Sequence, residues 1–231
     1  LIANGLYWLV RGYYSKQKSQ HFVNTFGLLF EDYIVDLTRR YCQEGECRQL
    51  PQSKKKGADF LLDLGNIQFL IESKSALLPL SVKQQVPNTD QADTFFTRTI
   101  SEAYEQLLSS YDQIKETSSK TIIKVVLLYD DFSNTGIIEK AITEIFDNDP
   151  CCFIMTIREL EILLYLHNRV PRKLNMVCEK IHEQITQAGE RKSLGAMFES
   201  LDIYDNPHLT GDMDYFHQLL KHFEKRLKVI S

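Results

Sequence analysis

The sequence has no apolar run close to the roughly 18 residues that a membrane-spanning helix needs. Its longest run, around 125–129, has the length of a β-strand. The first residues include no methionine and show no signal-peptide pattern, so we expect that a piece of the chain precedes Leu1. We find no internal repeat. These absences argue against a membrane partner and a repeat architecture.

The chain also lacks an excess of basic residues. It has 231 residues, with 27 Lys and Arg against 31 Asp and Glu, which gives a net charge of −4. A protein that binds nucleic acid through bulk charge is normally basic. Any such binding here must therefore use a local patch or a partner protein. The content of 43% hydrophobic and 25% charged residues is that of a soluble globular protein and excludes a collagen-like or low-complexity chain.

The cysteines do not form an obvious framework. There are five, an odd number, in a chain long enough to bury a core without disulfides. This pattern indicates a reducing compartment, and we expect a cytoplasmic location. Cys42 and Cys47 have the spacing of half a zinc site, but no second Cys or His pair at matching spacing accompanies them. We interpret them as two unconnected thiols.

Hydrophobic periodicity predicts an α/β protein. Apolar residues recur at helical spacing within a helical region over about 5–41, which Gly45 and Pro51 close. Two short apolar runs, 58–64 and 67–74, flank Gly65-Asn66, a two-residue turn typical of a β-hairpin. The elements expected after the hairpin are a helix over 94–115, a buried strand over 121–129, a short helix over 136–146, a strand over 151–156 and a helix from 157 to about 170.

Strands interleaved with helices predict a mixed central sheet that helices cover on both faces. Further helices are expected after about residue 160. We divide the chain into an N-terminal helical lead-in over 1–20, a core over 20–160 and a helical C-terminal extension over 160–231.

The hairpin carries the residues that point to chemistry. With a two-residue turn at Gly65-Asn66, the strand register places Asp59 opposite Glu72. Their β-carbons would then lie roughly 4.5–5.5 Å apart, which is repulsive in a purely structural sheet. A divalent cation such as Mg²⁺, which takes carboxylate and phosphate oxygens as ligands, would turn the pair into a metal site. Asp63 is roughly 13 Å from Asp59 at the rise of a strand and is not expected to be a ligand.

Lys74 lies two residues beyond Glu72, so strand alternation predicts that both point to one face and Ser73 to the other. A lysine there can hold a phosphate oxygen or help to deprotonate a metal-bound water. Asp59, Glu72 and Lys74 therefore predict metal-assisted phosphodiester hydrolysis. The alternative is a set of exposed edge-strand charges with a salt-bridged lysine. The position of the charges at the end of an apolar strand favours the catalytic interpretation.

The segment from Asp59 to Lys74 resembles the signature of the restriction-endonuclease-like, or PD-(D/E)xK, nucleases. In that superfamily an Asp begins one strand, and a Glu or Asp, one residue and a Lys lie on the next. Asp59 and Glu72-Ser73-Lys74 match in identity, order and strand placement. Ala58 replaces the proline that usually precedes the Asp. The resemblance covers about residues 20–160. It implies an α/β restriction-endonuclease-like core of helix, hairpin, helix and strand, with a helical C-terminal extension.

The same resemblance implies roles for two residues outside the hairpin. Many members carry a Glu on the first core helix, which Glu31 matches, and it would be a third acid at the metal site. A Gln on the helix after the second strand also recurs, and Gln106 fits. Taken without the resemblance, both would be side chains on a helix surface. The implied catalytic residues are Asp59, Glu72, Lys74, Glu31 and Gln106, and Mg²⁺ or Mn²⁺ would be held by Asp59, Glu72 and Glu31.

A basic run, Lys54, Lys55 and Lys56, precedes the hairpin. These lysines can contact phosphates beside the scissile bond, where each neutralised phosphate adds salt-dependent affinity. Most such runs are solvated loops, and the two alternatives stay open.

We therefore expect a Mg²⁺-dependent nuclease that hydrolyses DNA phosphodiester bonds. DNA comes from the resemblance, as does a role in bacterial restriction or phage defence. Two other classes stay open: a catalytically silent nuclease-like module that binds DNA or a partner protein, and an interaction domain whose charged cluster is only an ion-pair network. The acidic balance favours a protein partner, and a reader of double-stranded sites would commonly be a homo-oligomer.

Overall fold

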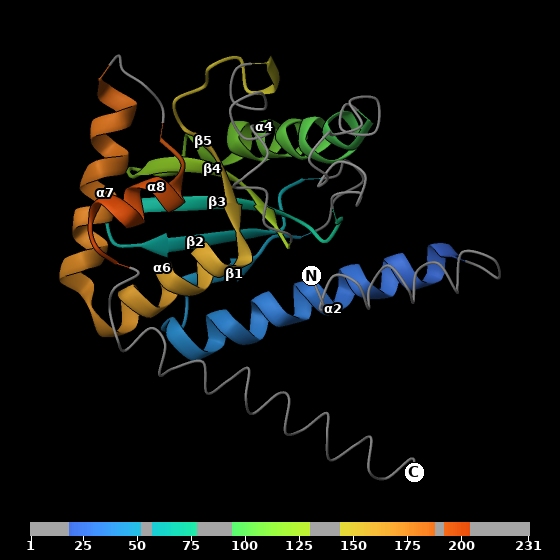
Figure 1. Cartoon of the computed structure of the whole chain (residues 1–231), viewed down its shortest axis with the longest axis horizontal. Helices are drawn as coiled ribbons and strands as arrows, with labels where there is room; N and C mark the ends of the chain where they lie inside the picture. The colour runs from blue at the N-terminus through green and yellow to red at the C-terminus, as the bar shows by residue number, and fades with distance from the viewer. Residues whose placement is uncertain (1–18, 52–56, 78–93, 130–143, 188–191, 204–231) are drawn as a thin grey trace, which may run out of the picture.

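The computed structural model describes residues 19–51, 57–77, 94–129, 144–187 and 192–203 (Figure 1). Several predicted features lie outside these residues. They are the lead-in up to residue 18, the lysine run at 54–56, most of the helix expected over 136–146, and the end of the C-terminal extension at 204–231.

Within the described residues, five strands form one mixed sheet in the order β1-β2-β3-β4-β5. The strands are β1 (Cys47–Gln49), β2 (Phe60–Leu64), β3 (Ile67–Lys74), β4 (Thr121–Leu128) and β5 (Cys152–Thr156). The first three pair antiparallel, and β4 and β5 continue the sheet parallel to β3. The predicted hairpin is confirmed, because Leu64 pairs with Ile67 across the turn. Gly65 has a φ of 75°, a conformation that favours glycine.

Helices cover both faces of this sheet, as the element order predicted (Figure 1). They are α2 (Ser19–Tyr41), the π-helix η1 (Phe96–Ser101), α4 (Glu102–Ile114), α6 (Ile157–Arg169), α7 (Pro171–Thr186) and α8 (Leu194–Ser200). Of these, α4 packs on one face, and α2, α6, α7 and α8 contribute to the core on the other. None of the described helices is both long and apolar enough to cross a membrane.

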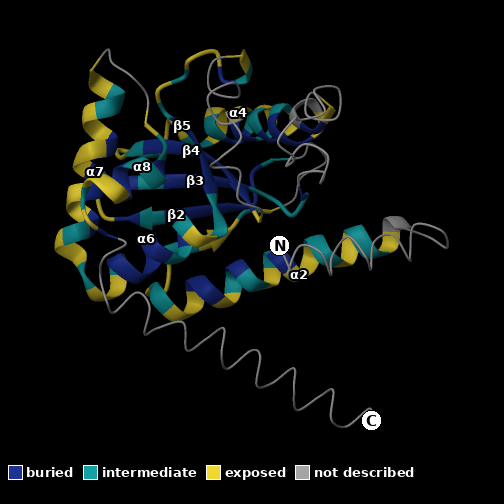
Figure 2. Ribbon diagram, viewed as in Figure 1, coloured by how far each residue is buried: buried dark blue, intermediate teal, exposed yellow. Residues whose placement is uncertain are grey.

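Alternating side chains along the strands divide the core into two clusters, one on each face of the sheet. On β3, Phe69 and Ile71 point toward α2, α6, α7 and α8, while Leu70 points toward α4. On β4, Val125 and Val126 alternate in the same way. Figure 2 shows these central strands in dark blue between helices with exposed outer sides. The sheet is therefore buried on both faces, which explains why β4 is an almost continuous apolar run.

The helices after the sheet begin with sequence signals of their own. Thr156 caps α6 through a capping box: Glu159 N–H donates to Thr156 Oγ1 at 3.3 Å, and Thr156 N–H donates to Glu159 Oε2 at 2.6 Å. Pro171 opens α7, where its missing N–H costs no hydrogen bond. Buried residues of α6, α7 and α8 join the cluster formed by β2, β3 and β4. These C-terminal helices thus share the core of the sheet.

Two elements were not predicted from the sequence. The short strand β1 has the sequence Cys-Arg-Gln and is largely exposed, so it carries neither the alternation nor the apolar run that indicates a strand. It forms because the edge of β2 offers unpaired backbone groups, and its three residues pair with Phe60, Leu61 and Leu62. The π-helix η1 opens the predicted helix over 94–115 and is continuous with α4.

Candidate active site

The predicted site residues on the hairpin meet at the carboxyl end of β3. This strand lies in the middle of the sheet, with β2 on one side and β4 on the other. Glu72 and Lys74 point to the face covered by α4, following Leu70 of the same strand. Glu72 is only 4% exposed, and Lys74 is partly buried. The charges expected at the end of an apolar strand therefore lie inside the protein rather than on a solvated edge.

Lys74 is held between its own strand, β3, and helix α4. Its Nζ donates to Glu72 Oε1 at 2.6 Å and to Gln106 Oε1 at 2.9 Å. Gln106 lies on α4, whose buried residues Ala103 and Leu107 pack on the sheet and fix the helix against β3. A lysine Nζ has three donors, and these two contacts set its direction. The structure thus brings Gln106 to the acid and lysine of the hairpin, although 32 residues separate it from Lys74 in sequence.

Glu72 is the most perturbed group of this site. Burial raises its pKa from 4.5 to about 7; nearby Lys74 opposes the rise, and the charges of Asp59 and Glu31 add to it. Its second oxygen, Oε2, is buried and has no hydrogen-bond partner among the described residues. An unsatisfied buried acceptor costs about 1–3 kcal/mol. Glu72 therefore presents an electron-rich oxygen that the described part of the protein does not satisfy.

Several hydrogen bonds fix the position of the backbone around Asp59. Ala58 N–H donates to Ser110 Oγ of α4 at 2.8 Å, a bond that a proline at this position could not form. Asp59 N–H donates to Ile71 O at 2.9 Å, and Asp59 O accepts from Leu50 N–H at 2.8 Å. A Cβ on Gly57 would lie only 2.7 Å from Ser110 Oγ, so the chain approaches α4 closely here. These contacts fix where the Asp59 side chain starts.

The expected facing pair of Asp59 and Glu72 is not a regular ladder pair. The ladder ends at Phe60, which pairs with Ile71, and Asp59 N–H bonds to the carbonyl of that same Ile71. Asp59 Oδ2 accepts from Ser73 N–H at 2.8 Å and from Ser73 Oγ at 2.7 Å. Asp59 therefore reaches toward Ser73, while its charge still raises the pKa of Glu72.

Glu31 approaches the same end of β3 from α2. Burial raises its pKa, the charges of Asp59 and Asp32 raise it further, and Lys74 opposes them. The predicted acid is half-buried, because Phe30 and Ile34 beside it pack into the core. The structure thus places Glu31, Asp59, Glu72 and Lys74 in one electrostatic environment. Within the described residues, however, no three Asp, Glu, His or Cys side chains are arranged as a metal-binding group.

The oxygens present suit a hard divalent cation. Glu72 Oε2 is buried without a hydrogen bond from the described residues, and it lies in the field of two further carboxylates. Mg²⁺ and Mn²⁺ take such carboxylate oxygens together with water and phosphate. A cation there would satisfy the acceptor and would offset both the burial and the carboxylate repulsion that raise the pKa of Glu72.

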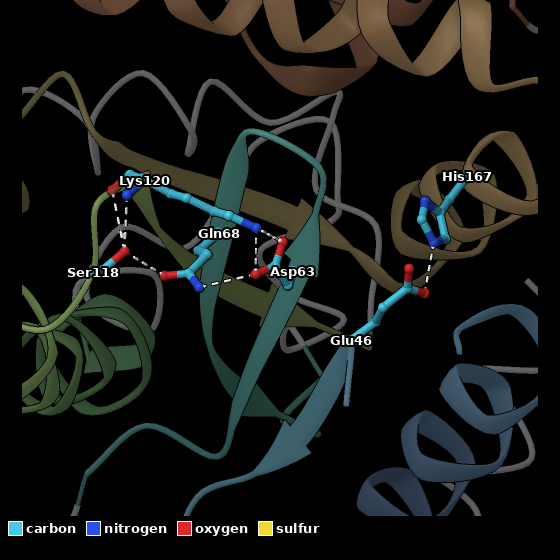
Figure 3. A network of polar contacts seen from close by, with 6 residues as sticks. All are labelled: Glu46, Asp63, Gln68, Ser118, Lys120 and His167. Atoms are coloured by element: carbon cyan, nitrogen blue, oxygen red, sulfur yellow. Dashed lines mark hydrogen bonds and ion pairs between the residues drawn. The ribbon is translucent and has the colours of Figure 1, made fainter. Parts of the chain in front are cut away.

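Residues outside the site have other partners. Asp63, which was not expected to be a ligand, accepts from Lys120 Nζ at 2.6 Å and from Gln68 Nε2 at 3.0 Å (Figure 3). Cys42 and Cys47 form no disulfide within the part of the chain that the structure describes. Lys54, Lys55 and Lys56 lie outside the described residues.

Sequence reasoning missed two residues of this site, Ser73 and Ser110. Ser73 was assigned to the opposite face of β3, so its bonds to Asp59 were not expected. Its place between the acid and the lysine is the one signal that singles it out. Ser110 carries no local signal, because only the packing of α4 brings it to Ala58.

No family model matches the chain, and no curated protein matches its sequence. Among solved structures, the fold is similar to the small subunit of the heterodimeric restriction endonuclease R.BspD6I. The two share 10% sequence identity with a TM-score of 0.38, over 75% of this chain and 88% of that one. A likeness of this size assigns no family, so the function is argued from the site itself.

Proposed function

We propose that this protein is a metal-dependent nuclease that hydrolyses phosphodiester bonds of DNA. The observation that carries the proposal is the carboxyl end of β3, where the buried Glu72 has an unsatisfied oxygen beside Lys74 and in the field of Asp59. Strongly perturbed acids paired with a specific cation are typical of catalytic sites. DNA as the substrate, and a place in restriction or phage defence, follow from the resemblance to PD-(D/E)xK nucleases.

Asp59 and Glu72 would hold Mg²⁺ or Mn²⁺, with Glu31 as a third acid. The ion would supply positive charge that lowers the pKa of a bound water and stabilises the phosphate at the transition state. The raised pKa of Glu72 means that a proton and the cation compete for this carboxylate near neutral pH.

Lys74 is the residue that would act on the substrate directly. Glu72 Oε1 and Gln106 Oε1 accept hydrogen bonds from two of its three N–H groups, which holds the ammonium group in place. The third proton would be donated to a phosphate oxygen or to the attacking water. Gln106 would be a positioning residue, because it contacts Lys74 and keeps the ammonium from turning fully toward Glu72.

The test is cleavage of plasmid and single-stranded DNA with Mg²⁺ or Mn²⁺. Wild type is compared with Glu72→Gln and Lys74→Met, which remove charge while keeping side-chain length. We expect nicking or degradation that requires metal and falls by at least about a hundredfold in both variants, the size of a lost electrostatic contact to the reacting groups.

The chain contains a matched control on the same sheet. Asp63 and Lys120 form an ion pair at 2.6 Å, the same distance as between Glu72 and Lys74, at the opposite end of the hairpin. Asp63→Asn and Lys120→Met should cut like wild type. Equal cutting by all five proteins would show a contaminating activity or a wrong site.

A second function is favoured by one observation, the absence of a three-ligand metal group among the described residues. A protein that holds DNA or a partner without cutting needs no such group. DNA binding without cleavage under any metal condition would support this alternative over the nuclease.

A further inference from the structure

Ser73 lies between the site residues Glu72 and Lys74 in the sequence, and it contacts the third residue of the hairpin site, Asp59. Its backbone N–H and its side-chain Oγ both donate to the same oxygen, Asp59 Oδ2, at 2.8 and 2.7 Å. Asp59 is only 7% exposed, so water competes little for these bonds. Both distances are those of well-formed hydrogen bonds.

Two donors on one oxygen determine how the carboxylate lies. A carboxylate oxygen has about two acceptor positions, and Ser73 occupies both on Oδ2. The backbone donor follows from the end of β3 and is independent of the side chain. The hydroxyl adds a second direction, so that together they restrict rotation of the Asp59 carboxylate about its χ2 angle.

The contact between Ser73 and Asp59 is separate from the other hydrogen bonds of the site. Strand alternation directs Glu72 and Lys74 toward α4, while Ser73 lies on the opposite side of β3. Ser73 therefore contacts Asp59 without entering the bonds among Glu72, Lys74 and Gln106.

We propose that Ser73 is a positioning residue: its hydroxyl binds Asp59 Oδ2 and so fixes the orientation of the carboxylate that would hold a divalent cation. This inference rests on the proposed function, because it assigns Asp59 to the metal. Hydrogen bonds behind a metal ligand orient that ligand, and their loss typically weakens metal affinity by about 10- to 100-fold.

The experiment compares Ser73→Thr with Ser73→Val. The two variants have the same branched shape, which suits a strand, and differ only in the hydroxyl. Binding of Mn²⁺ to the full chain is measured by calorimetry and by electron paramagnetic resonance, without DNA. We expect Ser73→Thr to bind within about 3-fold of wild type and Ser73→Val to bind at least about 10-fold more weakly. Ser73→Ala should match Ser73→Val and serves if the valine variant does not fold.

Cleavage assays add a second readout. If Ser73 acts through metal binding, Ser73→Val should need about tenfold more Mn²⁺ for half-maximal cutting and should recover most of its rate at saturating Mn²⁺. A loss of rate that persists at saturating Mn²⁺, with unchanged Mn²⁺ affinity, would overturn the proposal and indicate a structural role. Equal Mn²⁺ affinity in the threonine and valine variants would overturn it as well.

These outcomes are distinguishable from failure of the proposed function. If wild type binds Mn²⁺ and cuts DNA but the hydroxyl makes no difference, only the role of Ser73 is wrong. If wild type does not bind Mn²⁺, both are wrong. The control is Ser118→Ala, which removes a hydroxyl that donates to Gln68 Oε1 at 2.8 Å far from β3's carboxyl end and should leave Mn²⁺ binding unchanged.

Discussion

The burial of Glu72 predicts that this residue lowers the free energy of unfolding of the protein. The carboxyl group has an ordinary pKa of 4.5 and a pKa of about 7 in the folded protein. Below the lower value the group is protonated in both the folded and unfolded states and carries no penalty. As the pH rises from the lower to the higher value, the unfolded chain ionises first and is favoured. The cost of folding with Glu72 is therefore largest above the higher value.

The size of this cost follows from the pKa difference. At about 1.4 kcal/mol per pKa unit, it reaches about 3 kcal/mol at pH 8 and falls to about 1 kcal/mol at pH 5. Glu72→Gln removes the charge and keeps the shape. The new amide group needs an acceptor where Oε2 now lies, and this need offsets part of the cost that the substitution removes. We therefore expect the free energy of unfolding to rise by a net of about 1–3 kcal/mol at pH 8. At pH 5 the gain should be less than about 1 kcal/mol.

The assay is equilibrium unfolding in urea at both pH values, in the presence of a chelator. Asp63→Asn is the control, since it breaks a partly exposed ion pair with Lys120 and should cost less than about 1 kcal/mol. A Glu72→Gln protein that is no more stable than wild type at pH 8 would refute the reasoning. So would an equal gain at both pH values, because the effect would then not come from titration of Glu72.

Three further predictions concern the scaffold that holds the site, and each is measured by urea unfolding. Ser110→Ala leaves the Ala58 N–H without its acceptor and should cost about 1–3 kcal/mol, whereas a loss below about 0.5 kcal/mol would mean that water replaces the hydroxyl. Gly65→Val places a branched side chain at a φ of 75° and should cost about 1–2 kcal/mol, with Gly65→Asn costing clearly less; equal losses would exclude backbone strain as the cause. Leu163→Ala empties a fully buried position on α6 and should cost about 2–5 kcal/mol, and a smaller loss would show that α6 packs loosely on the sheet.

Local signals predicted the parts of the fold that depend on near neighbours in the sequence. The hairpin was predicted correctly because Gly65-Asn66 permits a two-residue turn, and the turn sets every following cross-strand pair up to Phe60 and Ile71. Strand β4 was predicted because a strand buried on both faces must be apolar throughout. Alternation likewise predicted that Glu72 and Lys74 share a face, and the bond between them confirms this.

The site depended on contacts that no local pattern contains. Asp59 leaves the regular ladder because Ile71 O accepts its N–H, so counting along the strands placed it opposite Glu72 instead of against Ser73. Gln106 was located only through a family resemblance, and it reaches Lys74 because α4 packs its buried side on β3.

What the sequence determined by itself was the register of the hairpin and the chemical type of its charged residues, because both follow from the chain's alternation over a few residues. Tertiary structure decided which of those charges are buried, which oxygens have donors, and how far each pKa moves. These properties depend on desolvation and on distances between side chains that α2, α4 and β3 bring together from separate parts of the chain.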